Sequence, residues 1–175
     1  TCDAGTGLPD LMVILDGSTL PAGADGVLST AVGAADVAIR GVSIVSGPAA
    51  GVVRGGTDNR VDCSLIGLLP DGTPLGNSGE GIRVSPEATG AQIGQPGFRT
   101  VVSDNGLQGI AIDATGTKVH TTWVGVGLDG VTAMGNALDG IRVESTANFV
   151  FVGGPGEQRS VISGNAENGV NVLGG

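Results

Sequence analysis

The sequence predicts an all-β fold, a parallel β-helix solenoid, and three observations carry this prediction. First, one phrase, Asn-x-x-x-Gly-aliphatic-x-aliphatic, begins at Asn77, Asn105, Asn136 and Asn165. The starts are 28, 31 and 29 residues apart (105−77, 136−105, 165−136), and a nearly fixed period of this length is typical of solenoids. Second, aliphatic residues alternate with other residues after each Gly, which is the period of a strand. Third, 34 glycines accompany many aliphatic residues and 2% aromatics, a composition that favours short strands and tight turns.

The N-terminal third is the less regular part of the predicted solenoid. Four segments are expected to be strands of one or two coils: residues 11–15, 26–28, 37–39 and 42–45. Gly51 lies 30 residues before Gly81 (81−51) and is expected one coil earlier. We therefore expect one domain over residues 1–175, irregular over 1–50 and regular over 51–175, with about six to seven coils in a rod roughly 30 Å tall.

Each regular coil is expected to contain three strand segments. One follows the Gly of the phrase, one ends in an aliphatic-Gly pair such as Ile66-Gly67 or Val124-Gly125, and one precedes the next Asn. The coils also echo each other in alternation, so the larger unit is two coils of about 59 residues (140−81). One coil of the unit carries an Asp-Gly loop and the other a Pro-Gly turn, and both dipeptides are typical of tight turns.

The longer runs resemble the repeat of right-handed parallel β-helix proteins. The resemblance lies in Ile66-Gly67, Asp71-Gly72-Thr73 and Leu75-Gly76-Asn77, and again from Val152-Gly153-Gly154 to Asn168-Gly169-Val170. The opening residues 11–18 also resemble the segment that precedes the first coils. The resemblance implies a right-handed helix and a place in large secreted or surface proteins of bacteria and some algae. It implies no particular activity.

Composition excludes several classes of partner. The net charge is −9 and the basic residues form no cluster, which disfavours nucleic acid and anionic membrane surfaces. The longest strongly apolar run, residues 11–15, is too short to span a membrane, so no membrane insertion is expected. No cofactor motif occurs. Cys2 and Cys63 either form a disulfide with each other or stay free.

The first candidate set is the column of four phrase asparagines. If they stack at equivalent corners, their amides form a ladder that satisfies turn backbone groups. The alternative is a polar ligand site. The second candidate is the outer face of the phrase strands, where Arg83 and Arg142 lie two coils apart and Asp113 reaches diagonally to either one, with Glu144 beside them. These side chains form either a groove for an acidic sugar or a solvated set of ion pairs.

The corner loops are the third candidate, because insertions on one face of a solenoid are often its binding face. Asp71 and Asp129 occupy equivalent loop positions, but one carboxylate per loop is a poor calcium site and no metal site is expected. Trp123 is expected to face outward with Leu65, and less clearly with Phe151. The tryptophan is either a platform for a sugar or partner or part of a satellite cluster beneath the loop. His120 has no ligand cluster around it in the sequence.

The favoured function is a non-catalytic structural or adhesive module of an extracellular or cell-surface protein or fibre. Because Val170–Val172 opens a new coil, we expect a segment of a longer protein, or copies and other segments stacking on the coil ends. A carbohydrate-binding module that takes polysaccharide is the alternative. A polysaccharide lyase, hydrolase or epimerase is disfavoured, because the carboxylates recur as repeat positions rather than breaking the repeat.

Overall fold

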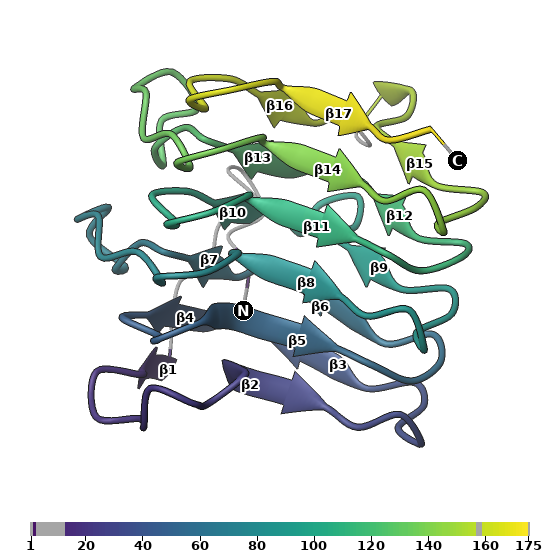
Figure 1. Cartoon of the computed structure of the whole chain (residues 1–175). Coiled ribbons are helices and arrows are strands. Elements are labelled where there is room, and N and C mark those ends of the chain that lie inside the picture. Colours follow the sequence, from purple (N-terminus) through teal and green to yellow (C-terminus); the bar gives the residue numbers. More distant parts are fainter. Residues whose placement is uncertain (1, 3–12, 157–158, 175) are drawn as a thin grey trace.

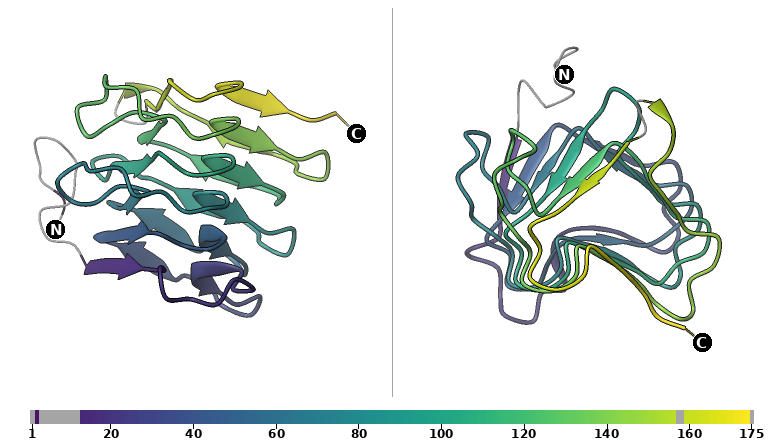
Figure 2. Two further views of the ribbon diagram at one scale, coloured as in Figure 1. Left: turned by 60° about the vertical axis from the view of Figure 1, so that its left-hand side comes forward. Right: turned by 90° about the horizontal axis from the view of Figure 1, so that it is seen from above.

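The chain winds into a parallel β-helix in which each turn adds one strand to each of three sheets (Figure 1). The structure is a computed structural model that describes residues 2, 13–156 and 159–174. In the described residues, five coils have a strand in all three sheets and a sixth has two strands. The predicted all-β solenoid is confirmed, and the described coils lie at the lower end of the predicted six to seven. Viewed along the stacking direction, the coils superimpose except at their loops (Figure 2).

The three sheets share parallel pairing between consecutive coils. Sheet I contains β1 (Val13–Asp16), β4 (Val42–Val45), β7 (Leu65–Ile66), β10 (Thr100–Val102), β13 (Thr122–Val124) and β16 (Val161–Ile162). Sheet II contains β2 (Gly26–Thr30), β5 (Ala50–Arg54), β8 (Ile82–Val84), β11 (Ile110–Ile112), β14 (Ile141–Val143) and β17 (Val170–Val172). Sheet III contains β3 (Ala38–Arg40), β6 (Arg60–Asp62), β9 (Gln92–Ile93), β12 (Lys118–Val119) and β15 (Phe151–Val152).

The core consists of columns of aliphatic side chains that run along the helix axis. In sheet II, Ile82 is in register with Ile110 and Ile110 with Ile141. All three side chains are buried. Alternation along each strand sends every second residue inward, and equal strand register stacks the inward residues on one another. The period of the sequence therefore becomes a continuous hydrophobic core.

The phrase asparagines form the predicted ladder at the corner between sheets I and II. The backbone N–H and the Nδ2 of Asn105 both donate to Oδ1 of Asn136, at 3.1 and 2.9 Å. Asn77 makes the same pair of bonds to Asn105, at 3.3 and 2.9 Å, and Asn136 makes them to Asn165, at 3.2 and 2.8 Å. Each amide therefore satisfies a backbone N–H that the corner leaves without a strand partner.

The glycine of the phrase is explained by the same ladder. A Cβ built on Gly81 would lie 2.7 Å from Nδ2 of Asn105, and one on Gly109 would lie 2.7 Å from Nδ2 of Asn136. Real Cβ atoms do not approach other atoms so closely, so a side chain here would displace the next rung. The phrase thus pairs the Asn that forms one rung with the Gly that makes room for the rung above it.

We predict that Asn136→Ala lowers the free energy of unfolding by about 2 kcal/mol, because it leaves the buried backbone N–H of Asn105 without an acceptor and removes one of the acceptors of its Nδ2. Asn148→Ala is the matched control, since Asn148 is exposed and donates to Thr146 O at the surface. The control should stay within about 0.5 kcal/mol of the parent chain. Urea denaturation followed by circular dichroism measures both, and equal effects of the two variants would contradict a stabilising ladder.

Candidate functional site

The outer face of sheet II carries a shallow groove over three consecutive coils. Arg83 of β8, Ala111 of β11 and Arg142 of β14 are in register and lie side by side across it. The small side chain of Ala111 leaves space between the two arginines. The groove has a volume of about 310 Å³, and Glu80, Asp113 and Glu144 also line it. The predicted placement of Arg83, Arg142, Asp113 and Glu144 on one surface agrees with this geometry.

The charged groups of the groove pair differently from the expectation. Nε of Arg142 lies 2.6 Å from Oε1 of Glu144, the residue that follows β14. Asp113 accepts a hydrogen bond from the hydroxyl of Thr146. The ion pairs of the described residues do not include the diagonal contact between Asp113 and an arginine. Asp113 contacts the threonine of the next coil instead, and Glu144 contacts Arg142 of its own coil, so both carboxylates already have partners.

Each corner loop is held by hydrogen bonds to an aspartate within the same loop. Asp71 lies between β7 and β8 and accepts from the N–H of Thr73, at 2.9 Å. Asp129 lies between β13 and β14 and accepts from the hydroxyl of Thr132 and from the N–H groups of Val131 and Thr132. The Thr132 hydroxyl, followed by these N–H groups, lowers the pKa of Asp129 to about 2. The N–H of Thr73 lowers the pKa of Asp71 in the same way. Both carboxylates are therefore turn-forming groups.

The described residues contain no group of three or more His, Cys, Asp and Glu side chains that could hold a metal ion. His120 lies after β12, with Nδ1 3.1 Å from the carbonyl oxygen of Gly153 in the next coil. The histidine thus contacts the backbone of the coil that stacks on its own. Neither observation assigns it a chemical role.

Trp123 belongs to a small hydrophobic cluster outside the main core. It packs with Leu65 and Val101, the residues in register with it on β7 and β10. The guanidinium carbon of Arg99 lies 3.9 Å from the centroid of the indole ring. Gly130 of the corner loop also approaches the ring, since a Cβ there would lie 2.8 Å from Cη2. The structure therefore brings Trp123 and Leu65 together beneath the loop, whereas Phe151 on β15 is 56% exposed.

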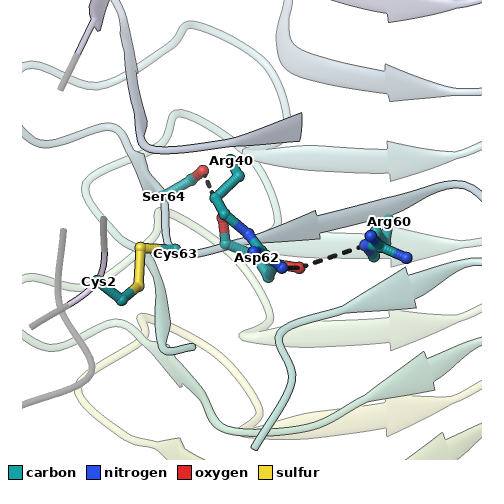
Figure 3. Close-up of a disulfide and its surroundings, with 6 residues drawn as sticks. All are labelled: Cys2, Arg40, Arg60, Asp62, Cys63 and Ser64. Atoms are coloured by element: carbon teal, nitrogen blue, oxygen red, sulfur yellow. Dashed lines mark hydrogen bonds and ion pairs between the residues drawn. A yellow bond between two sulfur atoms is a disulfide. The ribbon is translucent and has the colours of Figure 1, made fainter. Parts of the chain in front are cut away.

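Cys2 and Cys63 form a disulfide that ties the start of the chain to the corner between sheets III and I (Figure 3). Their Cα atoms are 5.9 Å apart and 61 positions separate them in sequence. A bridge of this span stabilises a protein by about 4 kcal/mol in the chain-entropy description. Of the two possibilities that the sequence left open, the structure has the paired one.

An ion-pair cluster around one buried carboxylate, beside the disulfide, was not identified from the sequence. The carboxylate of Asp62 is fully buried and accepts from Nε and Nη2 of Arg40, while Nε of Arg60 lies 3.6 Å away (Figure 3). The hydrogen bond to Asp62 raises the pKa of Arg40. Residues 40 and 62 are in register on β3 and β6, so the outward positions of these strands contained the signal. The irregular period of the N-terminal coils hid this register.

Arg54 is a second feature that sequence reasoning missed. It occupies the inward column of sheet II, in register with Val84 and Thr30, and its exposed fraction is 0%. In the described part of the chain, none of its three guanidinium nitrogens has a hydrogen-bond partner. Burial lowers the pKa of Arg54 to about 10. The signal was its position two residues after Val52, where the later coils have Val or Ile.

No protein-family model, curated protein or solved structure matches this chain. In the described residues, no helix has the length and the apolar character that a membrane span requires.

We predict that Arg54→Met raises the free energy of unfolding by about 1–3 kcal/mol, because it removes an unpaired charge from the core. The folded-state pKa of Arg54, about 10, lies below its ordinary value, so the charge destabilises the fold at every pH below about 10 and less above it. The gain should therefore be the same at pH 6 and pH 8. Urea denaturation measures it against Arg159→Met, which changes an exposed arginine and should have little effect. A loss of more than about 1 kcal/mol would show that Arg54 stabilises the fold.

Proposed function

We propose that this chain is a non-catalytic structural or adhesive repeat module, a rigid spacer of an extracellular or cell-surface protein or fibre. The observation that carries the proposal is the use of the repeated polar side chains inside the scaffold. Asn77, Asn105 and Asn136 are buried in the ladder, and Asp71 and Asp129 close their own loops. The positions that recur from coil to coil therefore serve the scaffold, either between coils in the ladder or within a corner loop.

The disulfide supports the proposed location. Disulfides persist in oxidising environments such as the cell exterior and are rare in the cytosol. The bridge between Cys2 and Cys63 spans 61 positions, so it constrains a large part of the unfolded chain. The resemblance of the repeat phrases to secreted and surface β-helix proteins agrees with the same location.

A carbohydrate-binding module is the second candidate, and the groove on sheet II favours it. Arg83 has no partner among the described residues, and the groove around it holds about 310 Å³. An unpaired guanidinium beside a shallow groove suits the carboxylate of an acidic sugar. Against this, the groove also carries Glu80, Asp113 and Glu144, and the chain has a net charge of −9, so an acidic ligand would meet like charges.

An enzyme acting on polysaccharide is less well supported than either module. Acid–base cleavage of a glycosidic bond needs two carboxyl groups that converge on one sugar. Asp113 and Glu144 line the same groove, but each already has a partner. Thr146 of the next coil donates to Asp113, and Arg142 of the same coil donates to Glu144. Trp123, the candidate stacking platform, lies against Arg99 and beneath the corner loop.

Three measurements test the proposed role. Antibodies against this chain should label intact, unpermeabilised cells of its native host, and labelling that needs permeabilised cells would contradict an extracellular location.

On a glycan array, the chain should bind no acidic glycan, and it should not turn over uronate polymers. Binding that is lost in Arg83→Ala but kept in Arg159→Ala would favour the carbohydrate-binding module. Loss of glycan binding in Trp123→Ala would favour a site at the corner loop.

A further inference from the structure

Arg54 places a guanidinium group inside the solenoid. It is the last residue of β5, and Val52, two positions earlier on the same strand, belongs to the hydrophobic core. Because residues two apart on a strand face the same side of a sheet, the side chain of Arg54 also points into the interior. Its exposed fraction is 0%. The interior of this coil therefore contains a charged group among aliphatic side chains.

The described part of the chain supplies no anion for this charge. Nε, Nη1 and Nη2 of Arg54 are all buried and have no acceptor among the described residues. The buried carboxylate of Asp62 is paired with Arg40 and Arg60 instead. Burial lowers the pKa of Arg54 to about 10, and no neighbouring carboxylate acts against this shift. Arg54 is therefore still a cation at neutral pH, and an isolated cation in an apolar interior is costly.

The polar groups of the turn after Arg54 are used by one another. The carbonyl oxygen of Gly55 accepts from Nδ2 of Asn59, at 2.7 Å, and from the hydroxyl of Thr30, at 2.9 Å. The same Nδ2 also donates to the carbonyl oxygen of Ala34 in the coil below, at 3.2 Å. The oxygens that follow Arg54 in the chain are therefore engaged in holding the turn, and none of them accepts from the guanidinium.

Small side chains line the interior at the corner after β5. Parallel bridges join the residues that follow Gly56, Ala88 and Ala114, so these three form one column at the corner between sheets II and III. Ala88 and Ala114 are buried in the core. No side chain in this column is larger than a methyl group, whereas the column of Arg54 itself continues with Val84. The surroundings suit a partner of about one atom, and they exclude a sugar or a phosphate ester.

We propose that a halide ion, chloride under ordinary conditions, binds inside the solenoid against the guanidinium of Arg54. The ion accepts N–H groups of Arg54 and neutralises its charge, as the carboxylate of Asp62 does for Arg40. A carboxylate or phosphate would bring further oxygens that need donors, and the described interior beside Arg54 offers no second cation. A halide carries a single charge and has no further oxygens to satisfy.

An ion bound only by the folded chain stabilises it by mass action. At chloride concentrations above the dissociation constant, each tenfold rise in chloride should raise the ratio of folded to unfolded chain about tenfold. The response requires the guanidinium of Arg54. The gain in stability expected for Arg54→Met should therefore be largest without halide, and it should shrink as chloride rises.

Urea denaturation of the intact chain tests the site, with sodium chloride exchanged for sodium gluconate at constant ionic strength. Gluconate is too large for the interior, so the parent chain should become more stable as chloride replaces it. Arg54→Met should not respond, whereas Arg159→Met, which changes an exposed arginine, should respond like the parent chain. Equal responses of the parent chain and Arg54→Met would overturn the site, and so would a parent chain that does not respond.

A second measurement needs no variant and keeps the test valid if Arg54→Met does not fold. Crystals of the parent chain grown in sodium bromide should show an anomalous scattering peak inside the solenoid, at hydrogen-bond distance from the guanidinium of Arg54. Bromide at the surface alone would be an adventitious ion only and would overturn the site. A water molecule in place of bromide beside Arg54 would overturn it as well. Neither experiment involves the groove or the cell surface, so both are independent of the proposed function.

Discussion

The fold depends on one constraint, which is that backbone N–H groups at the corner between sheets I and II need acceptors away from water. A parallel β-helix pairs its strands between coils, but the chain turns at the corner and has no strand partner there. Oδ1 of Asn105, Asn136 and Asn165 supplies the acceptor, and each oxygen receives two N–H groups from the coil below. Because the rung fixes where one coil lies on the next, it also fixes the register of the aliphatic columns in all three sheets.

This constraint accounts for most of the polar side chains that first suggested chemistry. The asparagines hold coil to coil, Asp71 and Asp129 hold the two longer corner loops, and the loop of Asp129 covers Trp123. Arg142 and Asp113 find their partners on the same or the neighbouring turn of chain. Among the described residues, the guanidinium of Arg83 in the groove takes part in none of these contacts. The groove is therefore the place on the surface where a ligand is best supported.

The sequence predicted the parts of the structure that repeat, because stacked coils convert a period directly into spatial neighbours. The ladder, the columns and the cluster of Leu65 and Trp123 followed from aligned positions. The contacts of Asp113 and the burial of Asp62 depend on the rotamers of single side chains, which a period does not determine. Arg54 was missed for a different reason. Its place two residues after Val52 indicates an inward position, but the period of the N-terminal coils is less regular and obscured this register.

Native-state hydrogen exchange of single backbone amides tests the ladder most directly. The N–H groups of Asn105 and Asn136 lie at a turn and donate to side-chain oxygens, not to a strand. If the ladder holds the coils together, these two amides should exchange as slowly as the core amide of Ile110, through global unfolding alone. The N–H of Asn165, which has no acceptor among the described residues, should exchange much faster. Rapid exchange of Asn105 and Asn136 while Ile110 stays protected would contradict the account, because the corner would then open without affecting the sheets.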